Sequence, residues 1–185
     1  MADTIRQPFG ADADTFTAKT SVNVGTASTG VTAVEYGNAH AHKTVLTIST
    51  TLPAIAGGAD LAVGKLLYTL PAGAIIIKGS YMSVSITQTE AHITADTPDG
   101  GLGTTIASGE VATLDGTAAF ENIMTGQTFN DCNGTAEVAT VTTNLAIPAA
   151  NDHTVYFNVA DGWAASGDAA AVLAGTVILE WDFLV

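Results

Sequence analysis

Short stretches that alternate between apolar and polar side chains recur along most of this chain, and this alternation predicts β-strands. Residues 42–51 alternate cleanly, with Leu46 on one side and Val45 on the other. The strongest stretch is 172–183, where Val177 and Trp181 fall on the same face because side chains two apart share a face of a strand. Further strands are predicted over 31–36, 66–70, 74–78, 81–87, 104–106, 111–114, 135–143 and 153–159.

Segments rich in glycine, proline, asparagine and aspartate separate the predicted strands. Gly79 is expected to break the run 74–78 from the strand 81–87, and residues 96–101 predict a turn inside a long connection. Residues 118–124 are the segment that favours a helical turn or two. Eight or more short strands indicate a β-sandwich or a barrel, and long, varied connections favour Greek-key or jelly-roll topology. We therefore predict an all-β, single-domain β-sandwich.

The first 30 residues differ from the rest of the chain. They are rich in Thr, Ala, Gly, Asp and Ser, and their apolar side chains Ile5, Phe9 and Phe16 follow no sustained period. We interpret 1–30 as an extended N-terminal arm and 31–185 as the β-sandwich domain. The arm is either a disordered tail or a segment that orders against a neighbouring subunit. Thirty extended residues reach about 100 Å, so contact with a neighbour is within range.

Charged side chains are scarce, and most of them are acidic. Only 12% of the 185 residues are charged, and 18 acidic against 5 basic residues give a formal net charge of −13. An average globular protein has about 25% charged residues. A nucleic-acid partner is not expected, because binding requires basic side chains that neutralise phosphates, and an anionic membrane surface would repel the chain too. The uncharged remainder is typical of a protein that buries much of its surface against neighbours.

Candidate ligands and catalytic groups are few and scattered. His40 and His42 would share one strand face and could bind a transition metal, but a third ligand is not evident and a polar strand edge is the simpler interpretation. Asp96 and Asp99 could offer oxygens to calcium, yet the alternating ligands of an EF-hand loop are missing. Cys132, the only cysteine, has no visible base beside it and is expected in a turn. We expect no metal, no cofactor and no enzymatic activity.

Two stretches carry a resemblance to a known group of proteins. One comprises residues 66–79, read as LLYTLPAGAIIIKG, together with 102–109, read as LGTTIASG; the other is the stretch LAGTVILEW over 173–181. Together they resemble small virion structural proteins of tailed bacteriophages, of the kind encoded beside the major capsid protein. That group includes capsid cement or decoration proteins with jelly-roll-like β domains. The resemblance implies a structural role and no catalytic residues.

These observations lead to a functional hypothesis. The chain is expected to be a non-enzymatic structural protein that binds the outside of a phage capsid and cements neighbouring capsomers. Its expected partners are the major capsid protein and further copies of itself, as a dimer or trimer, without nucleic acid or membrane. Its expected location is the exterior of the virion capsid, and Ile5, Phe9 and Phe16 are the predicted contact residues.

A second hypothesis belongs to a different class of function. The chain could be a carbohydrate-binding or adhesive module of a head fibre or a tail. Trp163, Tyr156 and Tyr81 would then stack on sugar rings, although a loop tryptophan packed on the core is the simpler interpretation of Trp163.

Overall fold

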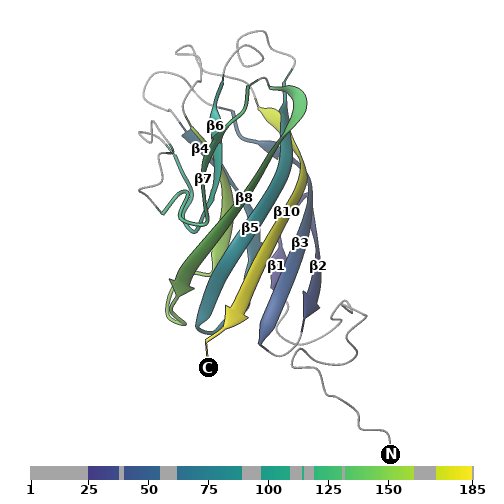
Figure 1. The fold of residues 1–185 in the computed structure, drawn as a ribbon. Helices are drawn as coiled ribbons and strands as arrows, with labels where there is room; N and C mark the ends of the chain where they lie inside the picture. The colour runs from purple at the N-terminus through teal and green to yellow at the C-terminus, as the bar shows by residue number, and fades with distance from the viewer. Residues whose placement is uncertain are drawn as a thin grey trace, which may run out of the picture.

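Two antiparallel β-sheets of five strands each face one another in the protein (Figure 1). The structure is a computed structural model, and it describes residues 25–37, 40–54, 62–88, 97–108, 114, 119–130, 132–160 and 170–184. Over these residues the regular structure is all β, which confirms the predicted all-β sandwich. The finer assignment to a jelly-roll or Greek-key topology stays a prediction.

The chain crosses repeatedly between the two layers, and β2–β3 and β6–β7 are the consecutive pairs that stay in one layer. Sheet A has the order β2-β3-β10-β5-β8, and sheet B has the order β1-β4-β9-β6-β7. The strands of sheet A are β2 (Val31–Gly37), β3 (Ala41–Leu52), β10 (Ala171–Phe183), β5 (Ile75–Thr87) and β8 (Asn133–Ile147). The strands of sheet B are β1 (Thr26–Ala27), β4 (Ala62–Thr69), β9 (Thr154–Ala160), β6 (Asp99–Gly103) and β7 (Met124–Thr128).

The core lies between the layers and follows directly from the alternation in the sequence. On β3 the side chains of Leu46 and Ile48 are buried, whereas Thr47 between them is exposed. On β10 the side chains of Val177 and Leu179 are completely buried. Burying an aliphatic side chain of this size contributes about 1.5–3 kcal/mol. The period of two therefore sets both the strand conformation and the face that enters the core.

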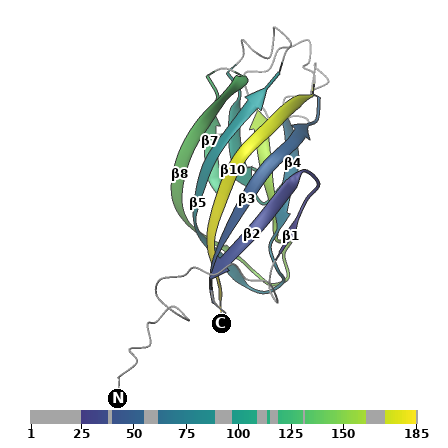
Figure 2. The same cartoon turned by 90° about the vertical axis from the view of Figure 1, so that its right-hand side faces the viewer.

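The two long sides of the sandwich are closed differently. On one side the edge strands β1 and β2 lie next to each other, and on the other side β7 and β8 do (Figure 2). The strands β1, β2 and β7 are short, with two, seven and five residues, whereas β8 has fifteen. The edge strand β8 is thus the longest strand of either sheet.

Four local predictions from the sequence are wrong. Gly79 does not end a strand, because β5 runs through it and a bulge in the pairing with β8 absorbs the irregularity. The stretch 99–101 is part of strand β6 and not a turn, since it pairs on both sides. Residues 104 and 105 form a bend and 106 has no regular structure, so 104–106 is not a strand. Residues 119–123 form a turn and bends with no helix before β7 begins. In each case long-range pairing or packing overrides the local preference.

Candidate functional site

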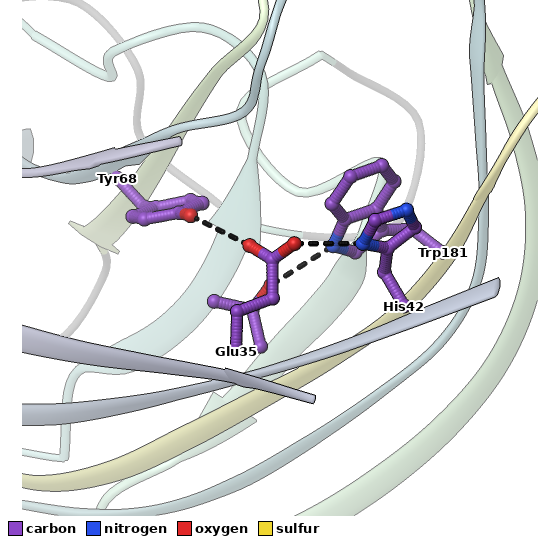
Figure 3. A network of polar contacts seen from close by, with 5 residues as sticks. Glu35, His42, Tyr68 and Trp181 are labelled. Atoms are coloured by element: carbon purple, nitrogen blue, oxygen red, sulfur yellow. Dashed lines mark hydrogen bonds and ion pairs between the residues drawn. The ribbon is translucent and has the colours of Figure 1, made fainter. Parts of the chain in front are cut away.

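A buried polar network links the two sheets near β2 and β3 (Figure 3). Glu35 lies on the edge strand β2 with the same parity as Val31, so its carboxylate points into the sandwich, where it is 2% exposed. One carboxylate oxygen, Oε1, accepts a hydrogen bond from Nδ1 of His42 at 2.7 Å. The other, Oε2, accepts one from the Tyr68 hydroxyl of sheet B at 3.1 Å. A single acidic side chain thereby ties β2 and β3 to the opposite layer.

Trp181 forms the far side of this network. It is the direct cross-strand neighbour of His42, and the two rings stack with centroids 4.0 Å apart and an angle of 8° between their planes. The indole Nε1 donates a hydrogen bond to Oγ1 of Thr44 at 2.9 Å. Phe183 meets both rings edge-on. The indole is therefore fully packed and its one polar atom is satisfied.

The pairing of a carboxylate with an imidazole is also found in catalytic sites, but here it is closed to substrate. The side chains of Glu35 and His42 have no exposed area at all, and Tyr68 is completely buried. Burial, reinforced by the neighbouring Glu35 carboxylate, raises the pKa of Tyr68 above its ordinary value of 10.0. Tyr68 therefore stays protonated and continues to donate its hydrogen bond. This arrangement stabilises the sandwich and offers no reacting group to solvent.

A second buried polar residue, Asn158 on β9, holds the loops that cover sheet B. Its Oδ1 accepts a hydrogen bond from the backbone N–H of Ala107 at 2.8 Å. Its Nδ2 donates to the carbonyl oxygens of Thr105 and Phe120 at 2.9 and 2.6 Å. One amide thus satisfies three backbone groups on two separate segments. The outward side of sheet B is covered here, so it is not a flat surface open to a partner.

The outer face of sheet A differs from the outward side of sheet B. Three consecutive cross-strand rows on this face contain no charged side chain. One row lies across the middle of the sheet, the next two follow toward one end, and all of their side chains are half-buried or exposed. The rows are Val34, Val45, Ile178, Tyr81 and Thr140; then Thr32, Thr47, Thr176, Ser83 and Val138; then Ser49, Ala174, Ser85 and Ala136. From strand and residue spacings the area is about 19 Å by 14 Å. We call these fourteen positions the uncharged face.

On the described strands of sheet A, charges appear on this side only beyond the uncharged face. Lys43 lies directly opposite Glu180 in the next cross-strand row, and Lys78 forms an ion pair with Asp182 at 2.9 Å. The acidic and basic side chains there compensate one another. In a chain with a net charge of −13, this sheet face is a local region of low net charge, suited to contact with another protein.

The predicted contact residues Ile5, Phe9 and Phe16 lie outside the described residues, as does Trp163. The two tyrosines predicted to join Trp163 in sugar stacking are described and lie on different sheets. Tyr81 belongs to β5 of sheet A, and Tyr156 belongs to β9 of sheet B. These two rings therefore do not form one stacking platform.

The prediction for the histidine pair is wrong. His40 is exposed before β3 begins, whereas His42 is 5% exposed inside the core, so they do not share a polar strand edge. Within the described part of the chain no group of three or more His, Cys, Asp or Glu side chains could hold a metal ion. The Asp99 carboxylate accepts a hydrogen bond from Thr128 at 2.7 Å, and Cys132 is buried in the core cluster.

Sequence reasoning missed Glu35, Thr44 and Tyr68 as members of one network. A signal was present for Glu35, because it occupies the inward parity of an otherwise alternating strand. An acidic residue at an inward position needs a buried partner. The sequence could not name that partner, since Tyr68 is 33 positions away on the other sheet.

Comparisons with protein-family models, with curated proteins and with solved structures found no match for this chain. Among the described residues there is no helix with the length and apolar character needed to cross a membrane.

Proposed function

We propose that the protein is a non-enzymatic structural component of a tailed-phage virion, which binds the outside of the capsid and cements neighbouring capsomers. The observation that carries this proposal is the uncharged face of sheet A. Its fourteen positions offer Thr, Ser, Ala, Val, Ile and Tyr side chains on a continuous sheet. A surface of this composition suits broad, shape-based contact with another protein better than capture of a charged small molecule.

The arrangement of the acidic groups supports the same proposal. Glu35 is used inside the fold to join the layers, and Glu121 is also buried, with Oε2 accepting a hydrogen bond from the Gly126 N–H at 2.8 Å. Neither carboxylate is exposed to a substrate. A net charge of −13 also suits the outside of a shell, away from packaged DNA. The capsid as the partner comes from the sequence resemblance of residues 66–79, 102–109 and 173–181.

Binding to capsid shells built from the major capsid protein of the same genome tests the proposal. The purified chain is mixed with the shells and its co-sedimentation is measured against free concentration. Thr176 lies at the centre of the uncharged face, and a Thr176→Glu variant introduces a carboxylate that must be desolvated on contact. We expect a loss of shell affinity of at least tenfold.

Thr125→Glu is the matched control, because Thr125 is exposed on β7 of sheet B. It adds the same charge on the other layer, so it should leave the affinity within about twofold. Equal binding by both variants would show that sheet A does not contact the shell. Absence of sedimentation by the unmodified chain would remove the capsid as its partner.

A further inference from the structure

The edge of β8 lacks most of the features by which proteins usually protect exposed strand edges. Such edges are commonly shortened, interrupted by proline, or blocked by lysine or an inward charge. The opposite edge strand, β2, has seven residues and an inward acid, Glu35. The edge strand β8 also has an inward acid, Glu137, which is its one charged side chain. It is, however, fifteen residues long and has no proline and no lysine.

The middle of β8 is regular enough to pair with a further strand. Its pairing with β5 is continuous from Ala136 to Thr142, and irregularities lie on either side of this stretch. Gly134, with φ of +97°, lies in the irregularity before it. These seven residues therefore form a straight segment whose outward backbone groups are positioned for an added strand.

We propose that two copies of the chain associate through this stretch, β8 against β8 in antiparallel orientation, so that sheet A continues from one copy into the other. A two-fold axis at the midpoint places Ala139 opposite the same residue of the second copy. It also places Val138 of each copy opposite Thr140 of the other copy. On the inner side, Ala139, Val141 and Leu145 are half-buried against the core, and the added strand would cover them further.

The β8 edge is a place where a second copy meets little electrostatic repulsion. Two chains of charge −13 repel one another over most of their surfaces, but β8 brings only one carboxylate from each copy. In this register the two Glu137 residues are offset by four positions, about 13 Å along the strand. This separation exceeds the Debye length of about 8 Å at physiological salt. The uncharged face would also continue across the junction of the two sheets.

The test is the molecular mass of the full chain in solution, measured by size-exclusion chromatography with light scattering from about 1 to 100 μM. We expect a dimer that dissociates on dilution. A double variant, Val138→Asp with Thr140→Asp, places carboxylates directly opposite one another across the two-fold axis. We expect its dimer affinity to fall at least tenfold, with the circular dichroism and melting temperature showing that it is folded.

Two matched variants separate this interface from a general effect of charge. Thr32→Asp with Val34→Asp adds the same charge at exposed positions of β2, the other edge of sheet A, and should leave the dimer intact. Val138→Asp with Thr140→Lys places opposite charges across the proposed register and should restore the dimer. This rescue is specific for the pairing of positions 138 and 140 between copies.

Three outcomes would overturn the inference. The first is a monomer at every concentration, and the second is a dimer that the double aspartate variant leaves unchanged. The third is an equal loss of the dimer in the double aspartate variant and in the variant with Val138→Asp and Thr140→Lys. A dimer that deletion of residues 1–24 abolishes, and that the β8 variants leave unchanged, would assign the contact to the arm instead. The measurement needs no capsid, so its result is independent of the proposed virion role.

Discussion

His42 and Trp181 are direct cross-strand neighbours on β3 and β10, and their rings stack almost in parallel, 4.0 Å apart. This contact fixes the orientation of the imidazole, whose Nδ1 then reaches the Glu35 carboxylate. The carboxylate in turn accepts the Tyr68 hydrogen bond from the other sheet. A chain of contacts from one aromatic pair therefore reaches from the middle of sheet A to sheet B.

The Glu35 carboxylate is predicted to be the most sensitive member of this network. Replacement by alanine leaves the Tyr68 hydroxyl and the His42 Nδ1 in the core without their acceptor. Removing one partner of a buried, hydrogen-bonded pair costs about 3–5 kcal/mol. Urea denaturation of Glu35→Ala should show a loss of this size in the free energy of unfolding.

Glu180→Ala provides the matched control for Glu35→Ala. Glu180 is exposed on the outer side of β10, so its removal should change the free energy of unfolding by no more than about 0.5 kcal/mol. Similar losses in the two variants would mean that the buried network contributes no more than a surface charge does.

Stability is predicted to fall at alkaline pH because of Tyr68. Its pKa is raised by burial and by the Glu35 carboxylate, so the folded chain keeps a proton that the unfolded chain loses near pH 10.0. A group that binds its proton more tightly in the folded state stabilises the fold fully below the unfolded pKa and less as pH rises above it. The free energy of unfolding should therefore drop above pH 10, by up to about 1.4 kcal/mol per pH unit.

Tyr68→Phe tests that assignment. The variant should be less stable at pH 7 by about 1.5–3 kcal/mol, since the carboxylate loses a hydrogen-bond donor. Its free energy of unfolding should then decline less steeply between pH 10 and 12 than that of the unmodified chain. Parallel pH profiles for the two proteins would contradict the assignment of the alkaline loss to Tyr68.

The stability of the fold is predicted to depend on the amide nitrogen of Asn158. Asn158→Asp preserves the size of the side chain and the acceptor for the Ala107 N–H, but it turns a carboxylate oxygen toward the carbonyls of Thr105 and Phe120. We expect a loss of about 2–4 kcal/mol in the free energy of unfolding, because two carbonyls lose their donor and face a like-signed oxygen. Backbone amides in 104–107 should also exchange with solvent faster.

Asn151→Asp is the control for Asn158→Asp, since Asn151 is exposed in the turn before β9. It should leave both stability and hydrogen exchange close to those of the unmodified chain. Unchanged exchange in 104–107 of the Asn158 variant would contradict the role of this amide in holding the loops.

Much of the fold was predictable because strand alternation is a local property. Parity placed Leu46 and Ile48 on one strand face, and Val177 and Leu179 on one face of another strand, without any knowledge of the neighbouring strands. The failures at Gly79 and at 99–101 have a different origin. Glycine favours breaks and turns locally, but strands on either side can hold it extended, and a single chain segment does not reveal those neighbours.

The alternation of side chains by itself determined that this protein is all β and which side chains share a strand face, since side-chain direction follows from the backbone of each strand alone. Only the tertiary structure decided that Glu35, His42 and Tyr68 meet, that Thr and Val positions from five strands form one uncharged face, and that β8 lies at an edge. Strand order depends on backbone hydrogen bonds between segments far apart in the chain. Those bonds use the same groups at nearly every residue, so the sequence carries little record of which strands pair.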